Sequence, residues 1–167
     1  GNRRPHKNWG ALIRALSLLA PERRPRVAIT GGRGDDPLAP LVSSLGLEKW
    51  VELRGWVDDA EVTRLYSVAT ALAIPSFAEG FSLPTLESMG AGLPALLSDI
   101  EVHRYVGGAA ARYFNPTDDG QLAALLEQVV TNPKLLEDMS VAGRARAAEF
   151  TWERTARETR SVFERAL

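Results

Sequence analysis

The segment PSFAEGFSLPTLESMGAGLP, residues 75–94, carries the pattern that decides the fold. An apolar run at residues 69–74 precedes it and predicts a buried strand that ends at Pro75. Residues 83–91 then follow helical spacing, and the apolar run at residues 94–97 predicts a second strand. Two strands joined by a crossover helix are parallel neighbours in one sheet. The segment therefore indicates an α/β fold.

The same alternation continues on both sides of this segment. Short apolar runs predict further strands at residues 26–30, 51–53 and 109–114. Amphipathic runs predict helices at residues 9–20, 37–45, 58–67, 118–131, 133–148 and 152–167, with Asn8, Asp58 and Thr151 as N-caps. Right-handed crossovers then give a Rossmann-like doubly wound parallel sheet, covered on both faces, with ligands beyond the carboxyl ends of its strands. We interpret residues 1–167 as one domain.

The composition is that of an ordinary globular domain. Of the 167 residues, 45% are hydrophobic and 25% charged, and the formal net charge is −1. This balance gives no general attraction to nucleic acid, so no nucleic-acid partner is expected. The sequence has no cysteine, and no apolar run approaches the ~20 residues of a membrane span. We expect a cytoplasmic protein, with any peripheral contact to the inner membrane face made by a domain outside this sequence.

The loop between the strand and the helix of residues 75–94 has the features of an anion site. Gly80 lets the backbone approach a ligand closely, and the chain then enters a helix N-terminus. Glu79 and Glu87 flank this point, where carboxylates suit the hydroxyl groups of a sugar and a ribose. The helix dipole and the free backbone N–H groups predict a phosphate cradle. These N–H groups belong to Phe81, Ser82 and Leu83.

Glu79 and Glu87 also match the E-x(7)-E motif of the retaining glycosyltransferases called family 4, in the setting E-G-F-x-L-P-x-L-E-x-M-x-x-G-x-P. The resemblance extends over almost the whole chain. Further segments follow in the family's order: residues 1–13 with Lys7-Asn8, residues 29–32, residues 53–59, Ser98-Asp99 and residues 150–156. The chain thus resembles the C-terminal, donor-binding domain of a two-domain GT-B glycosyltransferase of group 1. The N-terminal acceptor domain and the first strand would lie before Gly1.

The resemblance implies a role for each matching residue. Glu79 and Lys7 would be the catalytic residues: Glu79 would position the hydroxyl groups of the transferred sugar without acting as a nucleophile, and Lys7 would neutralise the diphosphate. Glu87 would bind the ribose, and Thr85 would add a hydroxyl near the phosphates. The backbone groups of two short stretches would complete the donor site. These are Gly80, Phe81, Ser82 and Leu83 for the sugar and diphosphate, and Gly55, Trp56 and Val57 for the base.

The chain departs from the family pattern at two positions. Asn2 follows the opening glycine, where the family often has an arginine. Arg3 or Arg4 would then contact the phosphate, and Arg3 is the candidate that we assign to the site. Tyr105 stands where a glutamate is common before V-x-G, which leaves the role of that loop open.

Several other conspicuous residues are expected to be structural. Residues 31–34, GGRG, lack the G-x-G-x-x-G spacing and predict a plain turn after a strand. His6 and His103 have no partner at catalytic or metal spacing, so both are expected at the surface. The tryptophans are expected to pack in the interior, and Trp56 would also border the base site. They are Trp9, Trp50, Trp56 and Trp152.

These observations predict the donor-binding domain of a hexosyltransferase of polysaccharide biosynthesis. Its partners would be a nucleotide sugar, an N-terminal domain of the same protein and a glycan or lipid-linked acceptor. GDP-mannose is one candidate donor, and UDP-sugars fit equally well. No cofactor or metal is expected, because the sequence has no Asp-x-Asp pair or histidine cluster. The isolated chain is expected to bind the donor weakly and to transfer nothing.

Other functions are compatible with the same fold. A nucleotide-sugar epimerase would lack the extended glutamate pattern, and a glycogen phosphorylase relative would need a pyridoxal-phosphate lysine that the sequence does not reveal. A non-catalytic nucleotide-binding module is a third alternative, against which the complete set of Lys7, Glu79 and Glu87 argues. A second Rossmann-like domain upstream would favour the transferase, and an unrelated partner domain would favour the module.

Overall fold

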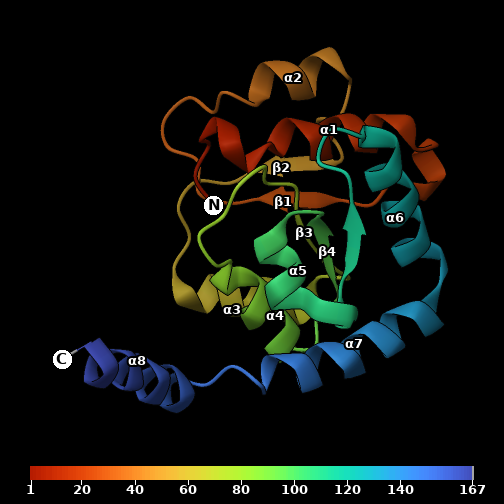
Figure 1. Ribbon diagram of the computed structural model, residues 1–167. Helices are drawn as coiled ribbons and strands as arrows, with labels where there is room; N and C mark the ends of the chain where they lie inside the picture. Colours follow the sequence, from red (N-terminus) through yellow and green to blue (C-terminus); the bar gives the residue numbers. More distant parts are fainter. Residues whose placement is uncertain (167) are drawn as a thin grey trace.

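The computed structural model describes residues 1–166 and places short parallel strands at the centre of the molecule, between helices (Figure 1). The strands are β1 (Val27–Ile29), β2 (Val51–Leu53), β3 (Leu72–Ile74), β4 (Ala95–Ser98) and β5 (Arg112–Phe114). They form two ladders, one of β1 and β2 and one in the order β3-β4-β5. The register pairs Ala28 with Glu52, Ala73 with Leu96 and Leu97 with Tyr113. Each predicted strand is thus present.

The helices follow the predicted alternation, with one addition. They are α1 (Trp9–Leu18), α2 (Ala39–Ser44), α3 (Asp59–Val68), α4 (Leu83–Gly90), α5 (Glu101–Gly107), α6 (Asp119–Thr131), α7 (Pro133–Ala147) and α8 (Trp152–Ala166), with 3-10 turns at Pro5–Lys7, Pro21–Arg23 and Gly108–Ala110. The sequence did not predict α5. This helix is short, and its buried face includes His103. A polar residue at that position interrupts the helical spacing of apolar residues by which a helix is predicted.

Strand β4 shows that helices cover both faces of the sheet. All four of its residues are buried, and successive side chains of a strand point to opposite faces. Leu96 belongs to a core that includes Leu16 of α1 and Leu122 of α6. Leu97 belongs to a second core with Met89 of α4. The doubly wound α/β fold is therefore confirmed, and the loops at the carboxyl ends of the strands are free to form a site.

Two of the predicted helix caps are confirmed in atomic detail. The Asp58 carboxylate accepts a hydrogen bond from the Glu61 N–H at 2.8 Å, at the start of α3. The Thr151 hydroxyl accepts one from the Arg154 N–H at 3.1 Å, before α8. Both signals are local in sequence, so they need no tertiary information.

The expected interior position is wrong for two of the tryptophans. Trp152 begins α8, which projects from the body of the molecule (Figure 1), and its side chain is 76% exposed. Trp56 lies in the loop after β2 and is 74% exposed. Trp9 and Trp50 are partly buried against the larger core, as expected. Within residues 1–166, none of the helices is long and apolar enough to cross a membrane.

Candidate functional site

Segments far apart in sequence meet at the carboxyl edge of the strands. The Phe77 N–H, in the loop after β3, donates to the His6 carbonyl at 2.7 Å. The Asn8 amide donates to the carbonyls of Pro75 and Pro116 at 3.0 and 2.9 Å. Asn8 therefore ties two loops to the start of α1. Asn8 occupies the N-cap position of α1 as predicted, but its side chain makes no cap hydrogen bond and its backbone is left-handed, with φ 52°.

Lys7 and Glu79 form an ion pair at this edge. The Lys7 Nζ lies 2.8 Å from each oxygen of the Glu79 carboxylate, and the Ser76 hydroxyl donates to Glu79 Oε1 at 2.6 Å. Burial by itself would raise the pKa of Glu79, but the hydrogen bonds from Lys7 and Ser76 outweigh it and lower the pKa. The carboxylate is thus ionised at neutral pH. The two residues that the sequence singled out as catalytic are brought together, although they are 72 positions apart.

The loop between Glu79 and α4 presents unpaired backbone donors. The N–H groups of Gly80, Phe81, Ser82 and Leu83 pair with no backbone carbonyl within residues 1–166. Ser82 has a left-handed backbone with φ 75°, which turns the chain into the first turn of α4. Free N–H groups at a helix N-terminus form an anion-binding arrangement. These N–H groups are therefore available to an anion, and the phosphate cradle stays a prediction from the sequence.

Thr85 supports this turn from inside. Its side chain is fully buried, and its hydroxyl lies 2.8 Å from the hydroxyl of Ser82. The Ser88 hydroxyl in turn donates to the Thr85 carbonyl at 2.9 Å. The Thr85 hydroxyl is thus engaged with Ser82, and this geometry favours stabilisation of the turn over direct contact with a phosphate.

Glu87 lies on the exposed surface of α4, in the second turn after the cradle. The Tyr66 hydroxyl of α3 donates to its Oε2 at 3.3 Å. Burial and the neighbouring Glu87 carboxylate raise the pKa of Tyr66, so the phenol keeps its proton and remains a donor. Tyr66 was not predicted as a site residue, because no local pattern signals a contact between two crossover helices.

The Arg3 side chain makes its hydrogen bonds to other groups of this chain. Its Nε lies 2.9 Å from Asp36 Oδ2, and its terminal nitrogens donate to the carbonyls of Gly1, Thr30 and Ile29 at 2.8 to 3.1 Å. Contacts of Nη2 to Asp36 at 2.7 Å and to the Arg54 carbonyl at 3.4 Å engage the remaining hydrogens. All five N–H groups of the guanidinium thus have protein acceptors. This geometry favours a structural role for Arg3 over the phosphate contact expected from the sequence.

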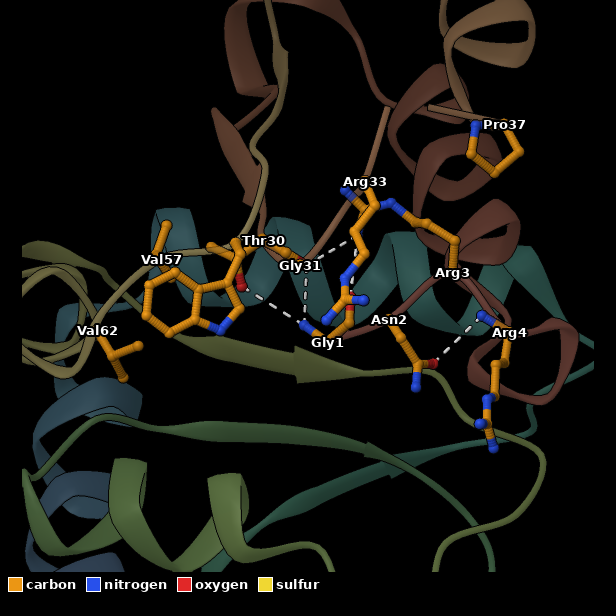
Figure 2. A pocket seen from close by; sticks show the side chains of 11 residues that line it. Gly1, Asn2, Arg3, Arg4, Thr30, Gly31, Arg33, Pro37, Val57 and Val62 are labelled. Carbon is orange, nitrogen blue, oxygen red and sulfur yellow. Dashed lines mark hydrogen bonds between the residues drawn. The ribbon is translucent and has the colours of Figure 1, made fainter. Parts of the chain in front are cut away.

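A pocket of about 610 Å³ opens beside this arginine, at the ends of β1 and β2. Figure 2 shows the side chains that line it, and Gly1 lies beside Thr30, to whose carbonyl its amino group donates at 2.8 Å. Trp56 and Val57 are part of the lining, as expected of a base site. Sequence reasoning missed further lining residues, although it placed ligands beyond the carboxyl ends of the strands, and one predicted strand ends at Thr30. They are Arg33, Pro37 and Val62; Arg4, the alternative phosphate contact named from the sequence, also lines the pocket.

The surface position expected for His103 is wrong. Its side chain is fully buried on the inner face of α5, because the helix packs this face against β4. Among residues 1–166, histidine, aspartate and glutamate side chains do not gather in groups of three or more that could hold a metal ion.

The chain is similar to known proteins in sequence and in fold. Residues 1–146 match the family model "Glycosyl transferases group 1". The O-antigen chain mannosyltransferase B of Escherichia coli is 34% identical, with 98% of this chain and 44% of the relative covered. The MMP alpha-(1->4)-mannosyltransferase of Mycolicibacterium hassiacum is 33% identical, with 98% and 41% covered. The chain spans less than half the length of these curated relatives.

Among solved structures, HepE from Anabaena in complex with UDP is similar, with a TM-score of 0.85 at 19% identity. The likeness covers 100% of this chain and 47% of HepE. At this level of sequence identity, the likeness shows only that this chain and the matched part of HepE have the same fold. The chain belongs to the glycosyl transferases group 1 family.

Proposed function

We propose that this chain is the donor-binding domain of a retaining glycosyltransferase that moves a hexose from a nucleotide sugar to a glycan or lipid-linked acceptor. The observation that carries the proposal is the Lys7–Glu79 pair beside the unpaired N–H groups of residues 80–83. A cation and a cluster of N–H groups suit a diphosphate, and a carboxylate suits the hydroxyl groups of a sugar. A further domain of the same protein would bind the acceptor.

The site would act on charge that develops as the donor breaks. The bond between the anomeric carbon and the diphosphate oxygen is cleaved, and its electron pair leaves with the diphosphate. Lys7 and the N–H groups of residues 80–83 stabilise this negative charge most strongly in the transition state. The acceptor hydroxyl oxygen bonds to the anomeric carbon on the same face, and its proton passes to the departing phosphate. Glu79 orients the sugar and forms no covalent bond.

The remaining groups would bind the nucleotide. Glu87, held by Tyr66, would accept hydrogen bonds from the ribose hydroxyl groups. The pocket lined by Gly31, Trp56 and Val57 would hold the base. The relatives named mannosyltransferases, at 33–34% identity, support a mannosyl donor, and GDP-mannose is the first candidate. A UDP-sugar is the second, because the residues of the proposed site suit the diphosphate, ribose and sugar of either nucleotide.

Titration calorimetry tests this function. The chain is titrated with GDP, UDP, GDP-mannose and UDP-glucose without metal, and each titration is repeated with Glu87→Ala. One nucleotide class is expected to bind, and the variant is expected to bind it about tenfold more weakly, which corresponds to one charged hydrogen-bonding contact. Glu22→Ala removes an exposed glutamate far from the site and serves as the matched control. Equal affinities of Glu87→Ala and the wild type would contradict the proposed ribose contact.

A null result needs one further titration. Because the chain spans less than half of its curated relatives, the cleft is expected to be completed by another domain. If no nucleotide binds to this chain, the same titration is made on the longer protein. A second absence of binding would contradict the transferase function.

A further inference from the structure

His103 is the buried titratable group that the proposed mechanism does not use. It lies on α5, and its side chain is fully buried. Its Nδ1 is 2.9 Å from the Ser98 carbonyl oxygen and 3.0 Å from the Ser98 hydroxyl. Ser98 ends β4, the strand that pairs with β3, and β3 leads directly into the Glu79 loop.

The hydrogen-bond pattern fixes which nitrogen of His103 carries the proton. The Ser98 hydroxyl donates its only hydrogen to the Ser76 carbonyl, so toward His103 it can only accept. The Ser98 carbonyl can also only accept. Nδ1 must therefore be the N–H donor to both atoms. Nε2 is then a bare acceptor, and it is buried without a hydrogen-bond partner among residues 1–166.

The same bonds continue to the ion pair. The Ser76 carbonyl accepts from Ser98, and the Ser76 hydroxyl donates to Glu79 at 2.6 Å. Glu79 in turn holds Lys7. A chain of side chains and one backbone carbonyl thus links the imidazole of α5 to the carboxylate of the loop. Fixing Ser98 fixes the backbone of Ser76, and with it the direction of the Ser76 hydroxyl.

We propose that His103 is a positioning residue of the donor site: as a neutral imidazole with its proton on Nδ1, it holds Ser98 and Ser76 so that Glu79 stays opposite Lys7. This inference rests on the proposed function, because Glu79 is assigned there to the sugar. His103 touches neither the donor nor the reacting atoms.

Electrostatics support the neutral form. Burial lowers the pKa of His103 below its usual 6.5 and outweighs the hydrogen bond to Ser98 and the charge of Glu79, which raise it, while the charge of Lys7 lowers it further. From β5, the Tyr113 hydroxyl lies 2.7 Å from the Gly108 carbonyl and 3.3 Å from the His103 backbone carbonyl, and it makes no hydrogen bond to the imidazole. Protonation would place a hydrogen on the buried Nε2 and a second cation near Glu79, in competition with Lys7. Donor binding should then weaken as the pH falls below 6.5 through the folded pKa of His103.

A pH series with GDP-mannose as the probe tests this dependence. His103→Leu removes the donor to Ser98, and binding at pH 7.5 is expected to weaken at least about tenfold, the effect of one lost buried hydrogen bond. His103→Asn places an amide N–H near the Nδ1 position and should restore binding to within about threefold. Because asparagine does not titrate, this variant should also lack the weakening between pH 7.5 and 5.

His6→Asn is the matched control, because His6 is the other histidine of the chain and contacts the site through its backbone carbonyl. It should keep the wild-type pH profile. Retention of the acid weakening in His103→Asn, or wild-type affinity in folded His103→Leu, would overturn the proposal. If His103→Leu does not fold, Ser98→Ala breaks the link to Ser76 with a smaller change in volume and should weaken binding in the same direction.

Magnetic resonance on the ligand-free chain separates this proposal from the proposed function. Nitrogen spectra at pH 7.5 should show His103 protonated at Nδ1 only. A carbon titration should show the pKa of the Glu79 carboxyl higher in Ser98→Ala than in the wild type, because its hydrogen-bond donor is less well placed. The opposite tautomer, or an unchanged Glu79 titration, would contradict the positioning role. Absence of nucleotide binding with both spectra as expected would contradict only the proposed function.

Discussion

Two ion pairs, whose cations Arg3 and Lys7 are four residues apart in sequence, lie at the same edge of the molecule and differ in which hydrogen-bonding groups remain available to a ligand. Arg3 and Asp36 have side chains that are 7% and 13% exposed, and every N–H group of the guanidinium has a protein acceptor. Lys7 and Glu79 are 22% and 11% exposed. The Lys7 ammonium bonds only to the Glu79 carboxylate within residues 1–166, beside a loop whose backbone N–H groups are unpaired.

The difference follows from the chemistry of the two cations. Arginine offers five donors in a fixed planar fork, so it can join a carboxylate and several carbonyls at once. Lysine is a compact charge on a flexible stem, and it can move from a carboxylate to a phosphate. The arginine therefore ties the segment before α1 to the ends of β1 and β2, and the lysine remains available to a ligand. One pair serves the fold and the other serves the site.

The largest effect is expected from breaking the structural pair. Arg3→Met leaves the Asp36 carboxylate buried without its partner and several carbonyls without donors. The free energy of unfolding should fall by about 3 kcal/mol, the usual cost of removing one partner of a buried pair. Urea unfolding of this variant and of Arg4→Met measures it. Arg4 is the exposed neighbour and should change stability by less than about 0.5 kcal/mol; equal losses would contradict the distinction.

The converse variant should spare the fold and damage binding. Lys7→Met removes the cation that faces the diphosphate, so donor affinity should fall about 10- to 100-fold, the value of one or two charged contacts. Its free energy of unfolding should fall by only about 1 kcal/mol, because Lys7 pairs with a single carboxylate to which Ser76 still donates, whereas Arg3 also satisfies several carbonyls. Calorimetry with GDP-mannose and urea unfolding are the two measurements. A loss of stability as large as that of Arg3→Met would remove the contrast.

Acid should act on both pairs in the same direction. For Asp36, burial opposes the shift, but the hydrogen bonds from Arg3 and the Leu38 N–H lower its pKa, and Glu79 is likewise lowered. A carboxyl whose folded pKa lies below its unfolded value stabilises the protein above the unfolded pKa, about 4. This stability is lost as the pH falls further. Unfolding curves between pH 6 and 3 should therefore be less pH-dependent in Asp36→Asn than in the wild type.

The smallest effect is expected at Ser82, whose backbone is strained beside the lysine pair. Its φ of 75° costs a non-glycine residue about 1 kcal/mol, and its hydroxyl contact with Thr85 returns a similar amount. Ser82→Gly should therefore leave the free energy of unfolding within about 0.5 kcal/mol of the wild type. Ser82→Ala keeps the strain and loses the contact, so it should cost about 1 kcal/mol. Thermal unfolding compares the two variants, and equal stabilities would contradict the strain.

Local signals in the sequence predicted most of the fold. Alternating strands and helices, and the caps Asp58 and Thr151, depend on near neighbours and are present in the structure. The motif around Glu79 located the loop that meets Lys7. Such patterns involve residues that are close in sequence, so they can be recognised without knowledge of the tertiary structure.

The remaining features depend on long-range packing. Nothing near Arg3 in the sequence shows that Asp36 and the end of β1 surround it. The burial of His103 follows from the packing of α5 on β4. A histidine at this buried position interrupts the spacing of apolar residues from which the helix could have been predicted. The exposure of Trp56 has the same origin, because a large aromatic residue in a loop is buried only if another element covers it.

The most direct measurement of the central claim is a backbone amide spectrum of the chain as GDP-mannose is added, recorded for the wild type and for Lys7→Met. The proposed site predicts saturable shifts at Gly80, Phe81, Ser82 and Leu83 in the wild type and much weaker ones at the same concentrations in the variant. The amides at the N-terminus of α7, a helix start that contributes no residue to the cradle or to the base pocket, should not move. Binding that leaves residues 80–83 unshifted, or that shifts both helix starts alike, would contradict the claim that this loop holds the diphosphate.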